Sequence, residues 1–530
     1  MVIGDTLRKA VKLFPRKEAV ICGDKRWTYA EFDRRVRGLA YHLMKRGVKK
    51  GERVAILHNN CHYFLESYYA CALLGIVSVP INVRLAAEEI VRIVEDAGAR
   101  MVISAHRYRE LLSAIQGKLK IPLSVIWTGV NKEDLSPGVE GPFYEEVIEE
   151  GLWMDEGSGV LEDDLAHLYY TSGTTGSPKG VMLTHKNVMV HAVGTIAELQ
   201  LTDRDVWLHG APLFHLADAW ATWAITWVGG RHVLVGDFLP SRVLSLIEQE
   251  RVTLTNLIPT MLNMLINDEQ VHQHDYSSLR LLLSGGAPIA PALVKRLVET
   301  FRCDYVQTYG MTETSPYLTL SLLKGHLLAG TFEEQLRYKA KTGREFIGVE
   351  LKVINERGEE VAKDEKEVGE IIVRGDTVTP GYWNLPDETE KVLKDGWLYT
   401  GDMAVIDEEG YVTIVDRKKD IIITGGENVY STEVENVLYL HPAVLECAVI
   451  GVPDEKWGEA VKALVVLKPG FAVDEGELIA FCKERIARYK APKSVDFLPA
   501  LPKTGTGKIE KQKLREKYRR DRGLADGSTI

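Results

Sequence analysis

YTSGTTGSPKG, residues 170–180, is the segment on which the interpretation of this 530-residue chain depends. Its glycines allow the backbone to adopt positive φ values and to point successive N–H groups into one concavity, which suits an anion. The hydroxyl groups of Thr171, Ser172, Thr174 and Thr175 can form hydrogen bonds, and Lys179 adds a full positive charge. The flanking segments, HLYY and GVML, have the composition of strands. The sequence therefore predicts an anion-binding loop between two strands; the alternative is a polar hairpin tip without a ligand.

This loop is not a P-loop. The pattern G-x-x-x-x-G-K-[ST] cannot be aligned with residues 170–180. A second glycine-rich segment, KTGTGK at 503–508, fails the same test, because Ile509 follows its lysine and position 502 is not a glycine. Neither segment by itself identifies a nucleotide site.

Composition restricts the class of protein. With 45% hydrophobic and 26% charged residues the chain is globular, and its length predicts about two to four domains. A net charge of −10 argues against nucleic-acid binding over the whole surface. Six cysteines without a CxxC pair indicate reduced, packed thiols and a cytoplasmic location. The longest apolar stretch, 68–81, is too short for a transmembrane segment, and the N-terminus does not have the pattern of a signal peptide.

Helical and strand-like segments alternate over the first four hundred residues, which predicts layered α/β structure with largely parallel sheets. One example is a capping box of Thr28 and Glu31 before a helix that carries Phe32, Val36 and Leu39. Shorter β segments follow at about 345–416, and an α+β unit follows beyond 420. We therefore expect a large N-terminal domain at 1–416, whose small β subdomain covers about 345–416, and a C-terminal domain at 417–530.

Seven segments together indicate a family. YTSGTTGSPKG is followed in order by PLFH (212–215), GGAP (285–288), YGMTET (309–314), YTGD (399–402), DRKKDIIITGGENVYSTEVE (416–435) and PKTGTGK (502–508). In these segments the chain resembles the adenylate-forming superfamily of acyl- and aryl-CoA synthetases, firefly-type luciferases and peptide-synthetase adenylation domains. GGENVYSTEVE is most similar to the CoA ligases, and the resemblance covers nearly the whole chain.

The resemblance implies an ATP site. Residues of the 170–180 loop would hold the β- and γ-phosphates, with Thr171 and Glu313 also holding Mg²⁺, a cation that prefers oxygen ligands. Asp402 would accept both ribose hydroxyls, and Arg417 would donate to the same sugar region. The nucleotide-binding residues implied are Thr171, Ser172, Gly173, Thr174, Thr175, Gly176, Lys179, Gly285, Gly286, Ala287, Pro288, Tyr309, Gly310, Thr312, Asp402 and Arg417.

It also implies two half-reactions in one chain. Lys508 would bridge the acyl carboxylate and the α-phosphate during adenylation, which a compact cation suits. The C-terminal domain would then rotate about a hinge at Lys419. In the second state Gly425, Gly426 and Glu427 would line the tunnel for the CoA thiol. The co-substrates implied are ATP, CoA and a small-molecule carboxylate, with Mg²⁺ as the metal.

The acyl group is less clearly indicated. His215 would lie between the acyl and phosphate sites, with Leu216, Ala217 and Trp220 in the acyl pocket. The segment LADAWATWAITWVGG (216–230) is consistent with either an apolar channel or packed core. Leu216 stands where peptide-synthetase domains have an aspartate for the amino group, which disfavours an α-amino acid. A fatty acid is the favoured substrate.

Three functions are weighed from the sequence. The leading one is a fatty acyl-CoA ligase that releases AMP and pyrophosphate. The alternative enzymes use an aryl or other carboxylate, or pass the adenylate to a carrier protein. A nucleotide-sensing binding protein is disfavoured, because every expected polar site residue is present. The sequence leaves open whether the chain forms a homodimer.

Overall fold

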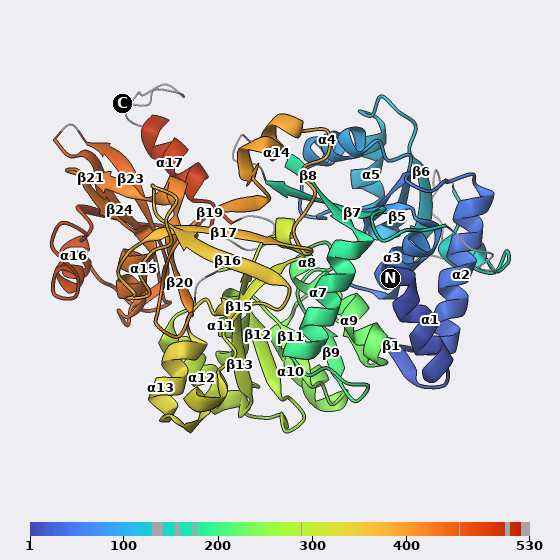
Figure 1. The fold of residues 1–530 in the computed structure, drawn as a ribbon, viewed down its shortest axis with the longest axis horizontal. Helices are drawn as coiled ribbons and strands as arrows, with labels where there is room; N and C mark the ends of the chain where they lie inside the picture. The colour runs from blue at the N-terminus through green and yellow to red at the C-terminus, as the bar shows by residue number, and fades with distance from the viewer. Residues whose placement is uncertain are drawn as a thin grey trace. The chain divides into compact units, whose positions relative to one another are not determined.

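A computed structural model of the chain describes residues 1–129, 141–153, 159–172, 178–287, 289–454, 456–503 and 509–520. The chain folds into two compact units: residues 1–288, 292–351 and 373–398 form the first, and residues 289–291, 352–372 and 399–530 form the second. Figure 1 shows strands flanked by helices throughout the first unit.

Two sheets form the frame of the first unit. In the described residues one sheet has six strands in the order β6-β5-β3-β4-β7-β8, and the other has nine in the order β15-β14-β13-β12-β11-β9-β10-β1-β2. The six strands are β3 (Arg53–Leu57), β4 (Val77–Pro80), β5 (Met101–Ala105), β6 (Ser124–Thr128), β7 (Leu165–Ser172) and β8 (Pro178–Thr184). The nine are β1 (Glu18–Cys22), β2 (Lys25–Thr28), β9 (Val206–His209), β10 (Arg231–Leu234), β11 (Leu254–Asn256), β12 (Leu281–Ser284), β13 (Asp304–Gly310), β14 (Tyr317–Leu320) and β15 (Arg344–Glu345).

The predicted parallel pairing is confirmed for the centres of both sheets. Strands β6 to β7 run parallel in the first sheet, as do β13 to β1 in the second, and antiparallel strands occur at the edges. Parallel strands need long crossover connections, which helices provide. The helices in this part of the chain are α1 (Ile3–Leu13), α2 (Tyr29–Lys45), α3 (His62–Leu74), α4 (Ala87–Ala97), α5 (Arg109–Gln116), α6 (Tyr144–Val147), α7 (His185–Glu198), α8 (Leu216–Ala219), α9 (Ala221–Val228), α10 (Pro240–Gln249), α11 (Pro259–Ile266), α12 (Pro291–Phe301) and α13 (Phe332–Lys339).

Helix α2 forms as its sequence predicts. The Thr28 side chain accepts a hydrogen bond from the Glu31 backbone N–H, and the Glu31 carboxylate accepts one from the Thr28 backbone. Phe32, Val36 and Leu39 are fully buried. The helix ends at Lys45, two residues before Gly47.

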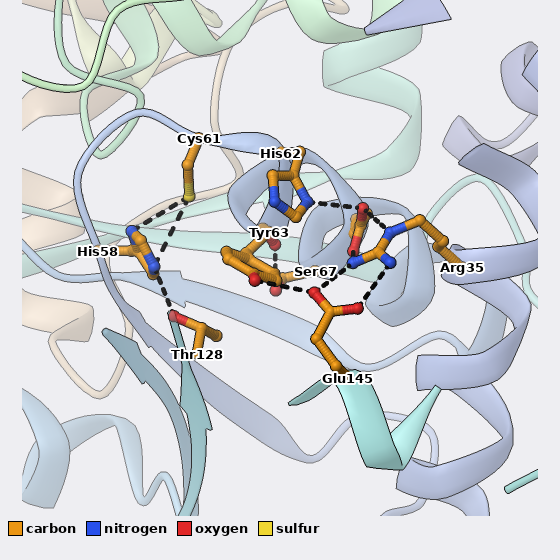
Figure 2. Close-up of polar contacts among 9 residues, drawn as sticks. Arg35, His58, Cys61, His62, Tyr63, Ser67, Thr128 and Glu145 are labelled. Atoms are coloured by element: carbon orange, nitrogen blue, oxygen red, sulfur yellow. Dashed lines mark hydrogen bonds and ion pairs between the residues drawn. The ribbon is translucent and has the colours of Figure 1, made fainter. Parts of the chain in front are cut away.

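A buried ionic cluster joins α2, α3 and α6. Arg35 on α2 contacts Glu66 on α3 at 2.6 Å and Glu145 on α6 at 2.8 Å, and His62 Nδ1 lies 2.9 Å from Glu66 (Figure 2). The Glu66 side chain is 0% exposed. Burial alone would raise the pKa of Glu66, but His62 and Arg35 outweigh it, so this pKa lies below its ordinary value. The carboxylate is therefore an ionised part of the core.

Two smaller sheets follow in the chain. One has the order β16-β17-β19-β18 with β20 on β19, and the other has the order β22-β21-β24-β23 with β25 on β24. Their strands are β16 (Val349–Ile354), β17 (Gly369–Gly375), β18 (Leu393–Lys394), β19 (Trp397–Ile406), β20 (Val412–Arg417), β21 (Ile422–Thr424), β22 (Glu427–Val429), β23 (Val444–Asp454), β24 (Gly458–Leu467) and β25 (Ser494–Phe497). The helices here are α14 (Pro386–Val392), α15 (Ser431–Tyr439), α16 (Glu475–Lys483) and α17 (Lys511–Arg520).

The predicted fold class, a large N-terminal α/β part followed by a small α+β part with its own sheets, is confirmed. Five of the six cysteines are buried and all six are free thiols. Within the described residues, no helix combines the length and apolar character that crossing a membrane requires.

Candidate active site

Strands β7 and β8 form the hairpin that the sequence predicts around the glycine-rich loop. Thr171 on β7 pairs with Lys179 on β8, so the two residues predicted to bind the phosphates and Mg²⁺ lie across from each other at the loop end of the hairpin. Tyr170, the residue before Thr171, donates a hydrogen bond from its hydroxyl to Asp96. Gly173, Thr174, Thr175 and Gly176 lie outside the described residues, as does the side chain of Ser172.

A segment distant in sequence pairs with the other edge of β8. Tyr382 forms a bridge with Val181, and the Trp383 backbone N–H donates to the Gly180 carbonyl at 2.7 Å. In the opposite direction, the Met182 N–H donates to the Gly381 carbonyl at 3.1 Å. Figure 1 shows α14, which follows this segment, beside β8. Residues 379–383 are therefore an extended strap along the strand that carries Lys179.

The same strap holds Glu313. This residue lies in a short 3-10 helix, Thr312–Thr314, and its side chain is largely buried. The Thr379 N–H donates to the Glu313 carbonyl at 2.8 Å, and the Tyr382 hydroxyl donates to Glu313 Oε1 at 2.9 Å. Burial, with the Glu313 charge second, raises the pKa of Tyr382, so its hydroxyl keeps the proton that it donates. The carboxylate of Glu313 is thus fixed in orientation.

Lys179 is enclosed by the continuation of the strap. Its Nζ lies 5.2 Å from the centre of the Tyr382 ring and 2.5 Å from Glu388 Oε2 on α14. The Lys179 side chain is 13% exposed. Hydrogen bonds from Lys179 and then Lys391 lower the pKa of Glu388 to about 2. The predicted phosphate-binding lysine and the predicted metal-binding glutamate are therefore positioned by one short segment.

The sequence did not single out Tyr382 or Glu388. They stand in GYWNLPDETE (381–390), where no spacing rule connects them to residues 179 or 313. The one local feature of the sequence is Gly381, a residue type that suits the positive φ of +141° found there in the structure. A long-range strand pairing of this kind has no periodicity of its own in a single sequence.

A further group of the residues that the resemblance implies for nucleotide binding follows β12 and ends β13. Gly285 and Gly286 come directly after β12, and Tyr309 and Gly310 are the last residues of β13. A Cβ on Gly285 would lie 2.2 Å from Thr308 Oγ1, and a Cβ on Gly310 would lie 1.8 Å from the Pro316 carbonyl oxygen. Packing within the protein therefore requires both glycines, whatever ligand they face.

Two neighbours complete this group. The Ala287 carbonyl accepts a hydrogen bond from the Gln307 side chain at 3.1 Å, and Pro288 lies outside the described residues. Thr312 opens the 3-10 helix that carries Glu313.

The predicted acyl residues surround helix α8. His215 occupies the N-cap position of this helix, and its ring centre lies 4.7 Å from that of Phe214; Leu216 is buried, and Ala217 is exposed. Trp220 is fully buried, with its ring centre 4.9 Å from that of Trp207, and its Nε1 donates to the Ala217 carbonyl at 3.0 Å.

Trp223, on α9, is also buried and stacks on His167 with ring centres 5.0 Å apart. Of the two interpretations of 216–230, packed core therefore describes Trp220 and Trp223.

In the second unit, Asp402 on β19 pairs with Arg417 on β20, and their side chains form an ion pair at 3.3 Å. Asp402 is largely buried and Arg417 is exposed, so an acceptor and a donor stand side by side. Lys419 follows in an exposed 3-10 helix, Lys418–Asp420.

Gly425 and Gly426 form the two-residue turn between β21 and β22, where Thr424 pairs with Glu427. Their φ values are +61° and +84°, the conformation that a tight hairpin requires and that favours glycine. A Cβ on Gly425 would meet the Trp457 ring at 2.8 Å, whereas a Cβ on Gly426 has no described atom within 4 Å. The turn conformation therefore favours glycine at position 426, and no described atom would contact a Cβ placed there.

Lys508 lies outside the described residues, but both flanks of its loop are described. Lys503 and Ile509 form an antiparallel bridge, and Lys511 on α17 contacts Glu435 at 2.7 Å and the Ser431 hydroxyl at 2.6 Å. Ser431 donates to Asp416, three residues before Lys419. Within the second unit the end of this loop is thus connected to the start of the predicted hinge.

Among the described residues there is no cluster of three or more His, Cys, Asp or Glu side chains suited to a metal ion. Two protein oxygens, from Thr171 and Glu313, are nevertheless a typical set for Mg²⁺, which takes its remaining ligands from phosphates and water. The orientation of Glu313 by Tyr382 fits that role.

Comparison with known proteins agrees with these features. The family model described as AMP-binding enzyme matches residues 7–383, and the model of its C-terminal domain matches residues 433–508. The chain belongs to the AMP-binding enzyme family. The resemblance to adenylate-forming enzymes is thereby confirmed.

Members of this family similar to the chain over its full length act on different acids. A feruloyl-CoA synthase of an Amycolatopsis species is 39% identical over 96% of this chain and 98% of its own. The long-chain-fatty-acid–CoA ligase FadD13 of Mycobacterium tuberculosis is 36% identical over 97% and 98%. The crystal structure of the anthranilate CoA ligase AuaEII with anthranoyl-AMP is similar with a TM-score of 0.88, at 28% identity over 99% and 98% of the two chains.

Proposed function

We propose that the protein is a fatty acyl-CoA ligase, which activates a fatty acid with ATP and transfers the acyl group to CoA. AMP and pyrophosphate are the other products. That it is an AMP-forming carboxylate–CoA ligase follows from its family and from full-length relatives named as CoA ligases. The observation that carries the assignment of the site is the strap at 379–383 with the helix α14 that follows it: Tyr382 holds Glu313, and Glu388 contacts Lys179.

The residues would divide the first half-reaction as follows. Lys179 and the loop after Thr171 bind the β- and γ-phosphates, and Asp402 and Arg417 bind the ribose. Glu313 and Thr171 hold Mg²⁺, which supplies positive charge to the phosphates when bound. Lys508 stabilises the negative charge that develops as the carboxylate attacks the α-phosphate.

We further propose that the chain consists of domains at 1–416 and 417–530 with a hinge at Lys419. The thioester step would follow a rotation of the C-terminal domain, with the thiol passing Gly426. A cytoplasmic location is consistent with six free thiols and with the use of ATP and CoA.

An aryl acid is the second candidate substrate. It is favoured by one observation, the 39% identity to a protein named feruloyl-CoA synthase. Trp220 and Trp223 are both buried. A substrate screen distinguishes the alkyl acid from the aryl acid.

The test is a screen of short-, medium- and long-chain fatty acids, aromatic acids and amino acids, with pyrophosphate release and CoA-dependent AMP formation as readouts. We expect the fastest release with a fatty acid and formation of AMP that requires CoA for turnover. Fastest release with ferulate-like acids would select the second candidate, and fastest release with amino acids would overturn both. AMP formation that needs a carrier protein in place of CoA would overturn the thiol assignment.

A further inference from the structure

The strap brings a negative charge to the lysine that the proposed function assigns to phosphate. Glu388 Oε2 lies 2.5 Å from Lys179 Nζ, and the other carboxylate oxygen of Glu388 accepts from Lys391. Phosphate oxygens of ATP and the carboxylate of Glu388 are both anionic hydrogen-bond acceptors. A phosphate that binds Lys179 must therefore replace or share this contact.

The position of Glu388 is set by the fold. The strap before it is hydrogen-bonded to β8 through Gly381 and Trp383. The Trp383 indole N–H also donates to the Asp96 carbonyl at 3.0 Å, which fixes the start of α14 against α4. Glu388 and Lys179 therefore belong to elements that are joined to each other, and their side chains meet without a large ordering cost.

The charge on Glu388 persists under working conditions. Hydrogen bonds from Lys179 and Lys391 keep its pKa at about 2, so the carboxylate is ionised whenever ATP binds at neutral pH. Since Glu388 titrates far below neutral pH, its competition with phosphate is constant over the range in which the enzyme works.

Resting on the proposed function, we propose that Glu388 competes with the phosphates of ATP and with pyrophosphate for Lys179. It thereby weakens the binding of both and helps pyrophosphate to leave, because the carboxylate pairs again with Lys179 once the phosphates depart. Glu388 is a positioning residue that acts through Lys179 and sets the affinity of the site for polyphosphate anions.

The central variant is Glu388→Gln, which keeps the shape of the side chain and removes its charge. We expect the KM for ATP and the inhibition constant of pyrophosphate both to fall by about two- to fivefold, the range that surface ion pairs contribute. The KM values for the carboxylate and for CoA should stay unchanged.

Two controls separate competition for Lys179 from a general effect of removing a negative charge. Glu390→Gln makes the same charge change on the same exposed helix, and we expect it to leave the KM for ATP unchanged. In a Lys179→Gln background, Glu388→Gln should no longer change the affinity for pyrophosphate, because the cation for which the anions compete is absent.

Calorimetric titration with pyrophosphate gives the same comparison without catalysis. If the wild-type protein released no pyrophosphate with any carboxylate, the proposed function would fail, while this titration would still decide the role of Glu388. An unchanged or weaker affinity in Glu388→Gln, or an equal gain in Glu390→Gln, would overturn the proposal.

Discussion

At the scale of single residues, Tyr382 determines how Glu313 is presented. Its hydroxyl donates to Glu313 Oε1 at 2.9 Å and so fixes the orientation of the carboxylate that the proposed Mg²⁺ site uses. Loss of an electrostatic contact to the reacting phosphates typically costs about 10²–10³ in rate. We therefore expect Glu313→Gln to reduce kcat by about this factor at saturating Mg²⁺.

Tyr382→Phe tests the orientation of the Glu313 carboxylate separately from its charge. Loss of a residue that orients a metal ligand typically costs about 10–100-fold in metal affinity. We expect this variant to need about ten times more Mg²⁺ for half-maximal activity, with kcat largely restored at high Mg²⁺. A Mg²⁺ titration checks both variants; an activity of Glu313→Gln equal to wild type at every concentration would make Glu313 structural.

Part of this site could be predicted from the sequence. Thr171, Lys179 and Glu313 stand in continuous motifs, so their types and order indicate their chemistry. Tyr382 and Glu388 could not be found in this way, because a strand pairing across the chain brings them to the site. Gly426 is a third case. The sequence motif singled out this glycine for the thiol tunnel, and its φ of +84° gives a second reason for glycine, the tight turn.

At the scale of elements, the buried cluster of α2, α3 and α6 predicts a dependence of stability on Glu66. Removing one partner of a buried ion pair costs about 3–5 kcal/mol, because the remaining charge is left uncompensated. We expect Glu66→Gln to lower the free energy of unfolding in urea by about 3 kcal/mol. Glu145→Gln, at a partner that is 37% exposed, is the matched control and should cost less.

The pH dependence of this effect has a definite sign. The pKa of Glu66 in the folded protein lies below its ordinary value, so its contribution is complete above the unfolded pKa, about 4.3. It is lost as pH falls through the lower, folded-state pKa. The difference between wild type and Glu66→Gln should therefore narrow below about pH 4, and a difference that widens there would contradict the ionised carboxylate.

Elements were predicted more completely than their contacts. Helix α2 and the β7–β8 hairpin follow from a capping box and from strand composition around a glycine-rich loop. The strap at 379–383 has no such signal, since an extended segment that adds to a sheet edge resembles any other loop between β elements.

The positive φ of Gly426 in the β21–β22 turn limits which residues can replace this glycine. Gly426→Asn keeps tolerance of positive φ while adding volume, whereas a branched residue would strain the turn.

At the scale of the whole molecule, the account assigns two half-reactions to one chain, the first of which needs the charge of Lys508. The second starts from a finished adenylate and has no pyrophosphate to release. The most direct test is to measure both steps on Lys508→Ala: adenylate formation from ATP and acid, and thioester formation from supplied acyl-adenylate and CoA. We predict that the first step is lost and the second remains close to the wild-type rate. Equal loss of both steps, with the protein folded, would contradict the separation of the two half-reactions.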